Sequence, residues 1–274
     1  MLLVMETQSQ AAIGGLIRDW RTRRRLSQLD LAGDAEISQR HLSFVESGRA
    51  RPSREMILKL AEHMAVPLRE RNRLLLAAGF APSFPERALS EPALGAAMEA
   101  IGQVLRGHEP NPAIAVDRHW NMVAANRSIA PFLAEVEDKG LLAPPVNVLR
   151  LSLHPKGISP RIVNFAEWRG HLLHRLRVQI AAVGDEGLVA LERELSGYPA
   201  RAGAAPIAAE KAPAIAIPLR LRHGSAVLSF ISTITVFGTP LDITLSELAV
   251  ESFFPADPET AAALRGLADT AAAR

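Results

Sequence analysis

Apolar side chains recur at helical spacing between Ile13 and Gly79, in clusters that are each too short to form a stable helix alone. We therefore expect several short helices that share one core. The clusters are Ile13, Leu16, Ile17 and Trp20; Leu29 and Leu31; Leu42 and Val45; and Ile57, Leu60, Ala61 and Met64.

Residues that begin and end helices stand between these clusters. Ser27, Ser38 and Ser53 each occupy an N-cap position, and Asp30 follows Ser27 at capping-box spacing. Gly48, Pro52 and Pro67 interrupt the helical pattern, and a fifth helix is expected to end near Gly79. The pattern predicts an all-α domain of five helices over residues 10–80.

The pattern changes beyond this domain. The segment GFAPSFPERALSEP at 79–92 is rich in proline and indicates a boundary, and a helix is expected at 93–105, so residues 81–110 are assigned to a linker and connecting helix. The pattern at residues 111–257 then predicts mixed α and β structure. One hairpin is expected from strands at 113–116 and 120–124, and a second from strands at 215–222 and 226–236. Helices are expected between the hairpins at 161–183 and 186–195. The Ala-rich tail at 258–274 predicts a helix, and the overall fold class is α+β.

Composition removes several classes of protein. The 274 residues include no cysteine, which excludes a disulfide scaffold, cysteine-ligated zinc, iron–sulfur clusters and thiol catalysis. No apolar run of about 18 residues occurs, and no basic residue precedes the opening MLLVM, so neither a membrane span nor a signal peptide is predicted. We expect a cytoplasmic protein.

Residues 1–80 carry 13 Lys and Arg against 9 Asp and Glu, whereas the remainder carries 18 against 20, so a polyanion would bind at the N-terminal end.

The string from Ser27 to Ser53 fits a helix-turn-helix. Ala32 supplies the small residue where two helices cross, and the facing sides are supplied by apolar residues at Leu31, Ala35, Ile37, Leu42 and Val45. The alternative is a helical bundle that only packs. Glu36 stands where such turns commonly use glycine, and a left-handed conformation would cost it about 1 kcal/mol.

This string resembles the lambda-repressor-like (Xre-type) DNA-binding domains, whose third helix lies in the major groove. The resemblance implies a phosphate contact for Gln28, base reading by Ser38, Gln39 and Arg40, and further contacts one turn along from Ser43 and Phe44. It also implies a structural salt bridge between Arg21 and Glu46. Arg49 and Arg51, in the loop after Gly48, suit the phosphate backbone.

The side-chain chemistry agrees with these roles. Glutamine can pair with adenine through two hydrogen bonds, arginine can do so with guanine, and an apolar ring can contact a thymine methyl group. Two alternatives stay open: the basic run at 21–25 is either a solvated helix face or a phosphate contact, and Phe44 is either a base contact or part of the core.

Two further segments carry a second resemblance. The string AIAVDRHWNMVAAN, from Ala113 to Asn126, resembles the start of PAS sensor domains. The segments Asn147 to Leu176 and Phe237 to Asp257 are similar to the ligand-binding domain of the MmyB-like regulators. The resemblance implies a PAS-like fold around a pocket, with a fatty acid or a similarly shaped lipid-like molecule as ligand.

An acyl chain requires an apolar channel, and its carboxylate requires hydrogen-bond donors at the mouth. Arg150 is the first choice of donor because its planar guanidinium matches a carboxylate. The full set of candidate donors is Asn147, Arg150, His154, Asn164 and Arg169. Candidate channel residues are Trp120, Met122, Phe165, Trp168, Phe230 and Phe237. The alternatives are that the aromatic residues and Met122 are ordinary core and that Asn126 and Asn147 cap helices.

The remaining chemistry of the sequence is sparse. His171 and His174 have a spacing that can present two imidazoles to a metal, and a haem held by His154 or His171 is an alternative. A polar helix face also explains the histidine pair. We therefore predict no metal and no cofactor. The string contains no GxSxG elbow, no phosphate-binding GxxxxGK[ST] loop and no HExxH motif. We therefore predict that the protein is not an enzyme.

The hypothesis from the sequence is a DNA-binding transcriptional regulator whose second domain senses a small molecule. One recognition helix reads only a few base pairs, so we expect a homodimer on an inverted repeat in double-stranded DNA. The alternative is a protein-interaction module whose second domain serves only dimerisation.

Overall fold

The structure is a computed structural model that describes residues 2–199, 217–238 and 240–272. The chain divides into two compact units. The first extends to Arg87 and the second begins at Ala88, with the short segments Ala181–Val183 and Pro240–Ile243 grouped with the first.

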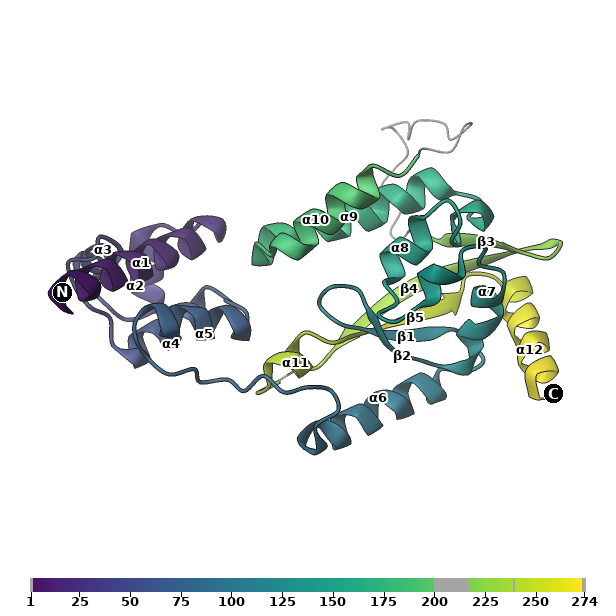
Figure 1. Ribbon diagram of the computed structural model, residues 1–274, viewed down its shortest axis with the longest axis horizontal. Helices are drawn as coiled ribbons and strands as arrows, with labels where there is room; N and C mark the ends of the chain where they lie inside the picture. The colour runs from purple at the N-terminus through teal and green to yellow at the C-terminus, as the bar shows by residue number, and fades with distance from the viewer. Residues whose placement is uncertain (1, 200–216, 239, 273–274) are drawn as a thin grey trace. The chain divides into compact units, whose positions relative to one another are not determined.

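The first unit is all-α (Figure 1). Its helices are α1 (Leu2–Arg23), α2 (Gln28–Asp34), α3 (Gln39–Glu46), α4 (Arg54–His63) and α5 (Leu68–Ala77). The three predicted N-caps are confirmed, because the hydroxyls of Ser27, Ser38 and Ser53 accept hydrogen bonds from the backbone N–H groups of Asp30, His41 and Met56. Ser27 and Asp30 form a complete capping box.

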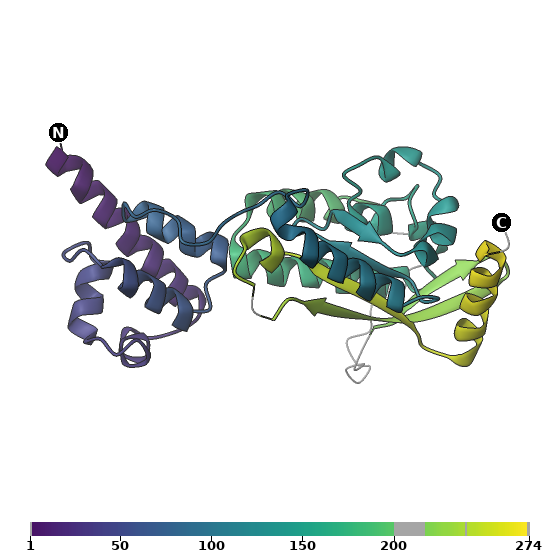
Figure 2. The same ribbon diagram turned by 90° about the horizontal axis from the view of Figure 1, so that it is seen from below.

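The core of this unit holds the helix-turn-helix together as predicted. Leu31, Ala32, Ala35, Leu42 and Val45 are all buried, and Ile37 packs against the same cluster as a partly buried residue. Figure 2 shows α1 running along the unit.

Two backbone positions allow this packing. A Cβ atom on Gly14 of α1 would lie 2.4 Å from the carbonyl oxygen of Val45, so only glycine permits the close approach of α1 and α3. In the turn between α2 and α3, Glu36 has φ of 53°, which is the left-handed conformation in which glycine is usual. Its carboxylate is 2.5 Å from Nζ of Lys59, an ion pair that ties the turn to α4.

The second unit combines one antiparallel sheet with helices. Its helices are α6 (Gly95–Gly107), α7 (Ala130–Ala134), α8 (Val148–Leu153), α9 (Phe165–Val183), α10 (Glu186–Ser196), α11 (Ile243–Ser246) and α12 (Pro258–Ala272). Its strands are β1 (Ala113–Val116), β2 (Met122–Ala125), β3 (Leu219–His223), β4 (Ala226–Val236) and β5 (Ala249–Pro255). Among the described residues, no helix has the length and apolar character that crossing a membrane requires.

The sheet has the strand order β2-β1-β5-β4-β3. The predicted hairpins are present as β1 with β2 and β3 with β4, although residues 215–216 of the predicted third strand lie outside the described residues. Strand β5, which the sequence analysis did not predict, lies in the middle and pairs with both hairpins. This order is compatible with the PAS-like arrangement implied by the resemblance.

Alternation along the central strands separates the two faces of the sheet. Ala113, Ala115 and Val250 belong to a core cluster with residues of α6. Ile114 and its cross-strand partner Glu251 instead face the side on which α8 and α9 lie. Figures 1 and 2 show α6 on one side of the sheet and α9 with α10 on the other.

Candidate functional site

The first turn of α3 projects polar side chains from the first unit. Ser38, Gln39 and Arg40 are exposed, whereas Leu42, Val45 and Glu46 on the opposite side of the helix are buried. This division follows helical periodicity, since residues three and four apart lie on one face. The proposed reading positions are therefore accessible to a partner, and Ser43, one turn further along, is half-buried.

Two arginines flank Phe44 on this surface. The guanidinium carbons of Arg40 and Arg49 lie 5.4 and 5.6 Å from the centre of the Phe44 ring, which is itself half-buried. Arg49 is exposed, and Arg51 is exposed but donates a hydrogen bond to the carbonyl of Ala78 at 3.2 Å. The loop after α3 thus adds positive charge beside the start of the helix.

The salt bridge implied by the family resemblance is confirmed. Nε and Nη2 of Arg21 donate to the two carboxylate oxygens of Glu46 at 2.6 and 2.9 Å. Gln28 also donates to Glu46 through its side-chain nitrogen at 2.7 Å. An amide nitrogen carries two N–H groups, so one remains for the phosphate contact implied for Gln28.

These contacts set the charge state of the pair. Burial raises the pKa of the Glu46 carboxyl, but the hydrogen bonds from Arg21 and Gln28 outweigh burial and hold the pKa below its ordinary value. The hydrogen bond to Glu46 likewise raises the pKa of Arg21. Glu46 is therefore ionised at neutral pH and joins α1, α2 and α3.

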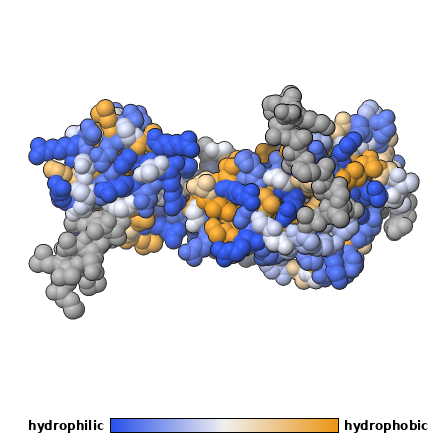
Figure 3. All heavy atoms as spheres, turned by 90° about the horizontal axis from the view of Figure 1, so that it is seen from above, coloured by the Kyte–Doolittle hydropathy of each residue, from blue (hydrophilic) through white to orange (hydrophobic). Residues whose placement is uncertain are grey.

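The basic run at 21–25 divides between structural and surface positions. Arg21 binds Glu46, and Arg24 donates to the carbonyls of Met64 and Ala65 at 2.8 and 3.0 Å. Arg23 and Arg25 are exposed. Hydrophilic residues dominate the face of this unit that is visible in Figure 3.

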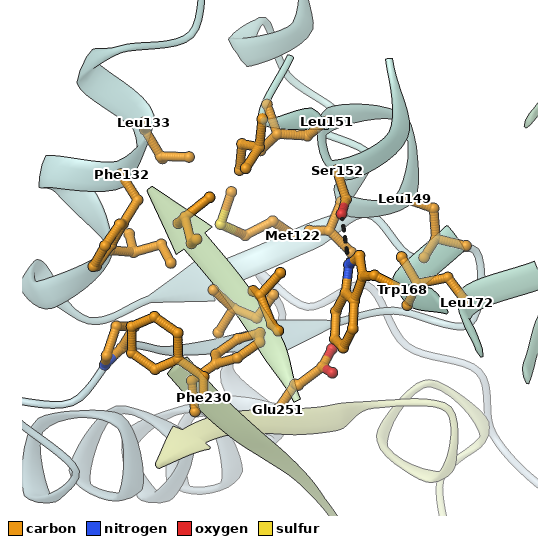
Figure 4. Close-up of a pocket in the computed structure, with 18 residues that line it drawn as sticks. Met122, Phe132, Leu133, Leu149, Leu151, Ser152, Trp168, Leu172, Phe230 and Glu251 are labelled. Carbon is orange, nitrogen blue, oxygen red and sulfur yellow. Dashed lines mark hydrogen bonds between the residues drawn. The ribbon is translucent and has the colours of Figure 1, made fainter. Parts of the chain in front are cut away.

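A cavity of about 100 Å³ lies between the sheet and the helices of the second unit. Strands contribute most of one wall, and α7, α8 and α9 contribute the other (Figure 4). Its 18 lining residues are Pro112, Ile114, Met122, Ile129, Phe132, Leu133, Val148, Leu149, Leu151, Ser152, Ile158, Trp168, Leu172, Leu219, Leu221, Phe230, Glu251 and Phe253. Apolar walls of this kind suit an apolar ligand.

The structure brings three of the expected channel residues together at this cavity, namely Met122, Trp168 and Phe230. The other three lie elsewhere. The Trp120 ring lies under the guanidinium of Arg175 and donates to Gln179, and Phe237 packs with the cluster that faces α6. Phe165 is buried but does not line the cavity.

None of the expected carboxylate donors lines the cavity. Arg150 lies on α8 between two residues that do, so its side chain leaves on the other side and binds Glu194 of α10 through Nε and Nη2 at 2.9 and 2.7 Å. Arg169 donates to the last carbonyls of α10, including that of Ser196 at 2.8 Å.

The three remaining candidates also have structural partners. Asn147 accepts a hydrogen bond from the Arg150 N–H and caps α8, while its amide donates to the His119 carbonyl. Asn164 donates to the carbonyl of Pro218 at 2.8 Å, and the His154 ring packs edge-on against Tyr198. Asn126, for which capping was an alternative, stands at the N-cap position of the short helix Arg127–Ile129, but its side-chain amide donates to the carbonyls of Leu105 and Asn111.

Sequence reasoning missed two polar residues of the cavity, Ser152 and Glu251. Nε1 of Trp168 donates to Oγ of Ser152 at 3.1 Å, and Nη1 of Arg175 donates to Oε1 of Glu251 at 3.1 Å. A signal that could have found Glu251 is the string AVESFF, in which valine and two phenylalanines favour a strand and glutamate is its one charged residue.

The histidine pair on α9 does not form part of a larger ligand cluster. Burial lowers the pKa of His171, and the neighbouring Arg175 and His174 lower it further. Within the described residues, no group of three or more His, Asp or Glu side chains could hold a metal ion.

Comparisons with known proteins cover both units. A family profile described as "MmyB-like transcription regulator ligand binding domain" matches residues 97–267, and one described as "Helix-turn-helix" matches residues 17–71. Both describe regulatory or binding domains, which accords with the expectation that the chain is not an enzyme. No curated protein matches the chain.

Two crystal structures of the clp gene regulator ClgR from Corynebacterium glutamicum are similar to part of the chain. One is 25% identical and covers 26% of this chain and 88% of its own, and the other is 24% identical and covers 37% and 95%. The TM-score is 0.23 for each.

Proposed function

The chain belongs to the family that carries the MmyB-like transcription regulator ligand binding domain, joined here to a helix-turn-helix region, and from this we propose that its first unit reads DNA and its second senses a lipid-like molecule. It is a ligand-responsive transcriptional regulator. In our proposal α3 reads the major groove through Ser38, Gln39 and Arg40, and the cavity of the second unit holds a fatty acid or a similarly shaped lipid-like molecule.

The observation that carries the DNA-binding role is the exposed first turn of α3. Its three polar side chains are free of the core, and each can reach a base edge if the helix enters the groove. Ser43 and Phe44 extend the contact by one turn, while Gln28, Arg49 and Arg51 bind phosphates and set the orientation. The hydroxyl of Ser38 caps α3 by accepting a hydrogen bond, so its own O–H can still be donated to DNA.

We propose that the regulator acts as a homodimer on an inverted repeat. A single recognition helix contacts only a few base pairs, and two half-sites one helical turn apart supply the specificity that one lacks.

The cavity offers a route by which a ligand changes DNA affinity. An engineered cavity of about 150 Å³ holds benzene, so the smaller cavity of about 100 Å³ takes a tail of roughly four carbon atoms as it stands. A longer tail fits only if the sheet and helices move apart. Such a ligand has different affinities for two arrangements of the second unit, which is the condition for coupling a ligand to a second site.

Selection from a randomised duplex library with the full chain tests the DNA-binding proposal. Binding to the selected duplex should weaken with salt by a log–log slope of about −0.9 for each neutralised phosphate. Gln39→Ala with Arg40→Ala should remove sequence preference and leave weak, salt-sensitive binding, because each two-bonded base contact contributes about 1–3 kcal/mol of discrimination. Arg73→Ala, at an exposed arginine of α5, is the matched control. A double variant that discriminates between duplexes as well as the parent would show the reading positions to be wrong.

Thermal unfolding of the full chain with a long-chain fatty acid tests the sensing proposal. The fatty acid should raise the Tm, and lipid should be detectable by mass spectrometry in protein purified from cells. Leu172→Trp, which fills the cavity, should abolish the rise in Tm, whereas Val178→Trp on the exposed side of α9 should preserve it. An equal rise in Tm for the parent and Leu172→Trp would place the ligand elsewhere.

A further inference from the structure

Arg40 and Phe44 are neighbours on one face of α3. They are four residues apart, a spacing that places two side chains side by side on a helix. Helical side chains lean toward the N-terminus, so the Phe44 ring leans toward the turn that carries Arg40. The guanidinium carbon of Arg40 lies 5.4 Å from the centre of the ring, within the range at which an aromatic face attracts a guanidinium. The two side chains therefore form one unit on the surface of the helix.

The ring holds Arg40 without using its hydrogen-bond donors. In the part of the chain that the structure describes, Arg40 donates to no carboxylate or carbonyl, and its one contact of this kind is with the ring. Other arginines of this unit are bound to the chain itself, as Arg21 is to Glu46 and Arg24 to the Met64 carbonyl. The planar fork of Arg40 can therefore donate twice to one guanine, at O6 and N7.

Phe44 adds an apolar surface beside this fork. The core cluster of the unit includes Leu42 and Val45 but not Phe44, whose ring is half-buried. Arg49 also lies beside the ring, with its guanidinium carbon 5.6 Å from the ring centre. An apolar ring between two cations suits the major groove, because the C5-methyl group of thymine is the apolar feature that bases present there.

The distance between the two groups limits which bases they can contact. Successive bases of a strand are about 3.4 Å apart along the axis of the duplex, and the guanidinium carbon and the ring centre are separated by 5.4 Å. Two groups this close contact the same base pair or adjacent ones. The base pair that Arg40 reads is guanine with cytosine and carries no methyl group, so a methyl group that Phe44 contacts belongs to an adjacent base pair.

The methyl group alone would be recognised by the ring. Thymine and 5-methylcytosine both carry a methyl group at C5, whereas uracil and cytosine do not. A phenylalanine ring has no hydrogen-bonding group with which to distinguish the two methylated bases.

We propose that Arg40 and Phe44 read a guanine and an adjacent 5-methylpyrimidine as one unit, so that 5-methylcytosine can take the place of thymine and DNA binding responds to cytosine methylation. This inference rests on the proposed reading of the major groove by α3. It deepens that proposal by naming Phe44 as a specificity-determining residue and a methyl group as the feature that it recognises.

Methyl substitution in the selected duplex tests this inference. Selection with Arg40→Ala identifies the guanine that Arg40 reads, because preference for that base should be lost. Each pyrimidine in the adjacent base pairs is then varied among thymine, deoxyuridine, cytosine and 5-methylcytosine, and binding of the full chain is measured by fluorescence anisotropy. At one position the parent should bind thymine about fourfold more tightly than deoxyuridine, the factor expected for burial of one methyl group. It should prefer 5-methylcytosine over cytosine by a similar factor.

Variants of Phe44 show whether the ring makes the contact. Phe44→Ala should reduce both methyl preferences to less than 1.5-fold and weaken discrimination at the guanine, whereas Phe44→Leu should keep about half of each preference. Each preference compares two duplexes bound by the same protein, so a loss of folded protein cancels. A ring that only supports the fold would weaken all duplexes equally. Phe84→Ala is the matched control, since Phe84 lies 5.9 Å from the guanidinium of Arg71 outside α3, and it should keep both preferences.

The outcomes separate this inference from the function beneath it. Equal binding of the thymine and deoxyuridine duplexes by the parent at every adjacent position, or unchanged methyl preferences in Phe44→Ala, overturns the inference alone. Failure of the full chain to select any preferred sequence overturns the proposed reading by α3 as well.

Discussion

Each unit buries a glutamate and binds it to an arginine from another element, but the two glutamates have different surroundings. Glu46 receives hydrogen bonds from Arg21 on both oxygens and another from Gln28. Among the residues that the structure describes, Arg175 alone donates to Glu251, which faces a cavity. A carboxylate that its own chain satisfies holds helices together, whereas one with capacity left over can recognise a second molecule.

The same contrast holds for the cores around them. In the first unit Leu31 and Ala32 of α2 and Leu42 and Val45 of α3 are buried in a packed core, and the proposed DNA contacts lie on the outer surface of α3. In the second unit apolar side chains of the sheet, α8 and α9 surround a cavity, and the proposed ligand site lies inside it. Packed interiors resist change and hollow ones accommodate a ligand, so one unit suits a fixed reading surface and the other a sensor.

The largest expected effect comes from removing the satisfied carboxylate. Glu46→Ala leaves Arg21 and Gln28 without their acceptor and should lower the free energy of unfolding of the first unit by about 3–5 kcal/mol. Hydrogen–deuterium exchange measured on peptides from α3 reports this unit separately from the second. Glu251→Ala should have a smaller effect on peptides from β5, because Arg175 keeps its contact with Trp120. Equal losses would remove the distinction between the two glutamates.

The next largest effect is a difference in unfolding free energy between the same substitution, Leu→Ala, in the packed core of the first unit and beside the cavity of the second. Leu42→Ala should cost about 4 kcal/mol and Leu172→Ala about 2 kcal/mol, within the range usual for buried leucines. Leu42 has neighbours on every side, whereas Leu172 already faces the cavity and loses fewer contacts. Chemical denaturation of each variant measures the two losses, and a larger loss for Leu172→Ala would show that its surroundings are as tightly packed.

A smaller effect depends on pH. The folded state lowers the pKa of Glu46, so ionised Glu46 stabilises the first unit fully above the ordinary carboxyl pKa of 4.5 and loses that contribution as pH falls through the lower folded value. Exchange of α3 peptides should therefore accelerate between neutral pH and acid conditions more in the parent than in Glu46→Gln, after correction for intrinsic rates. The same acid dependence in both proteins would assign the destabilisation to other carboxyls.

The smallest effect belongs to the surface pair on α8 and α10. Arg150→Ala should lower the stability of the second unit by only about 0.2–1 kcal/mol, because Arg150 and Glu194 are both more than a third exposed. It should leave ligand affinity unchanged. A tenfold loss of fatty-acid affinity in calorimetry would instead identify Arg150 as the carboxylate donor expected from the sequence.

The exposed first turn of α3, which we propose to read DNA, could be predicted because its determinants are local. Ser27 and Ser38 set the starts of α2 and α3, and helical periodicity then assigns Leu42 and Val45 to the core and Gln39 and Arg40 to the surface. Even Glu36 could be singled out from the sequence, because a turn of this kind needs a left-handed residue.

The cavity of the second unit could be predicted only in part. Met122, Trp168 and Phe230 were identified because they are large and apolar. The expected donors were not brought to the cavity, since the direction of Arg150 depends on which face of α8 meets the sheet, and a helix of six residues does not reveal that face by periodicity.

By itself, the amino-acid sequence determined the five helices, their caps, the two hairpins and the family of each part, because these depend on residues close together in the chain. Only the tertiary structure decided that β5 joins the two hairpins and that Glu251 lies opposite Ile114, more than a hundred positions earlier. Pairing of distant strands depends on the whole arrangement of the sheet, so Glu251 reaches the wall of the cavity only when the chain has folded.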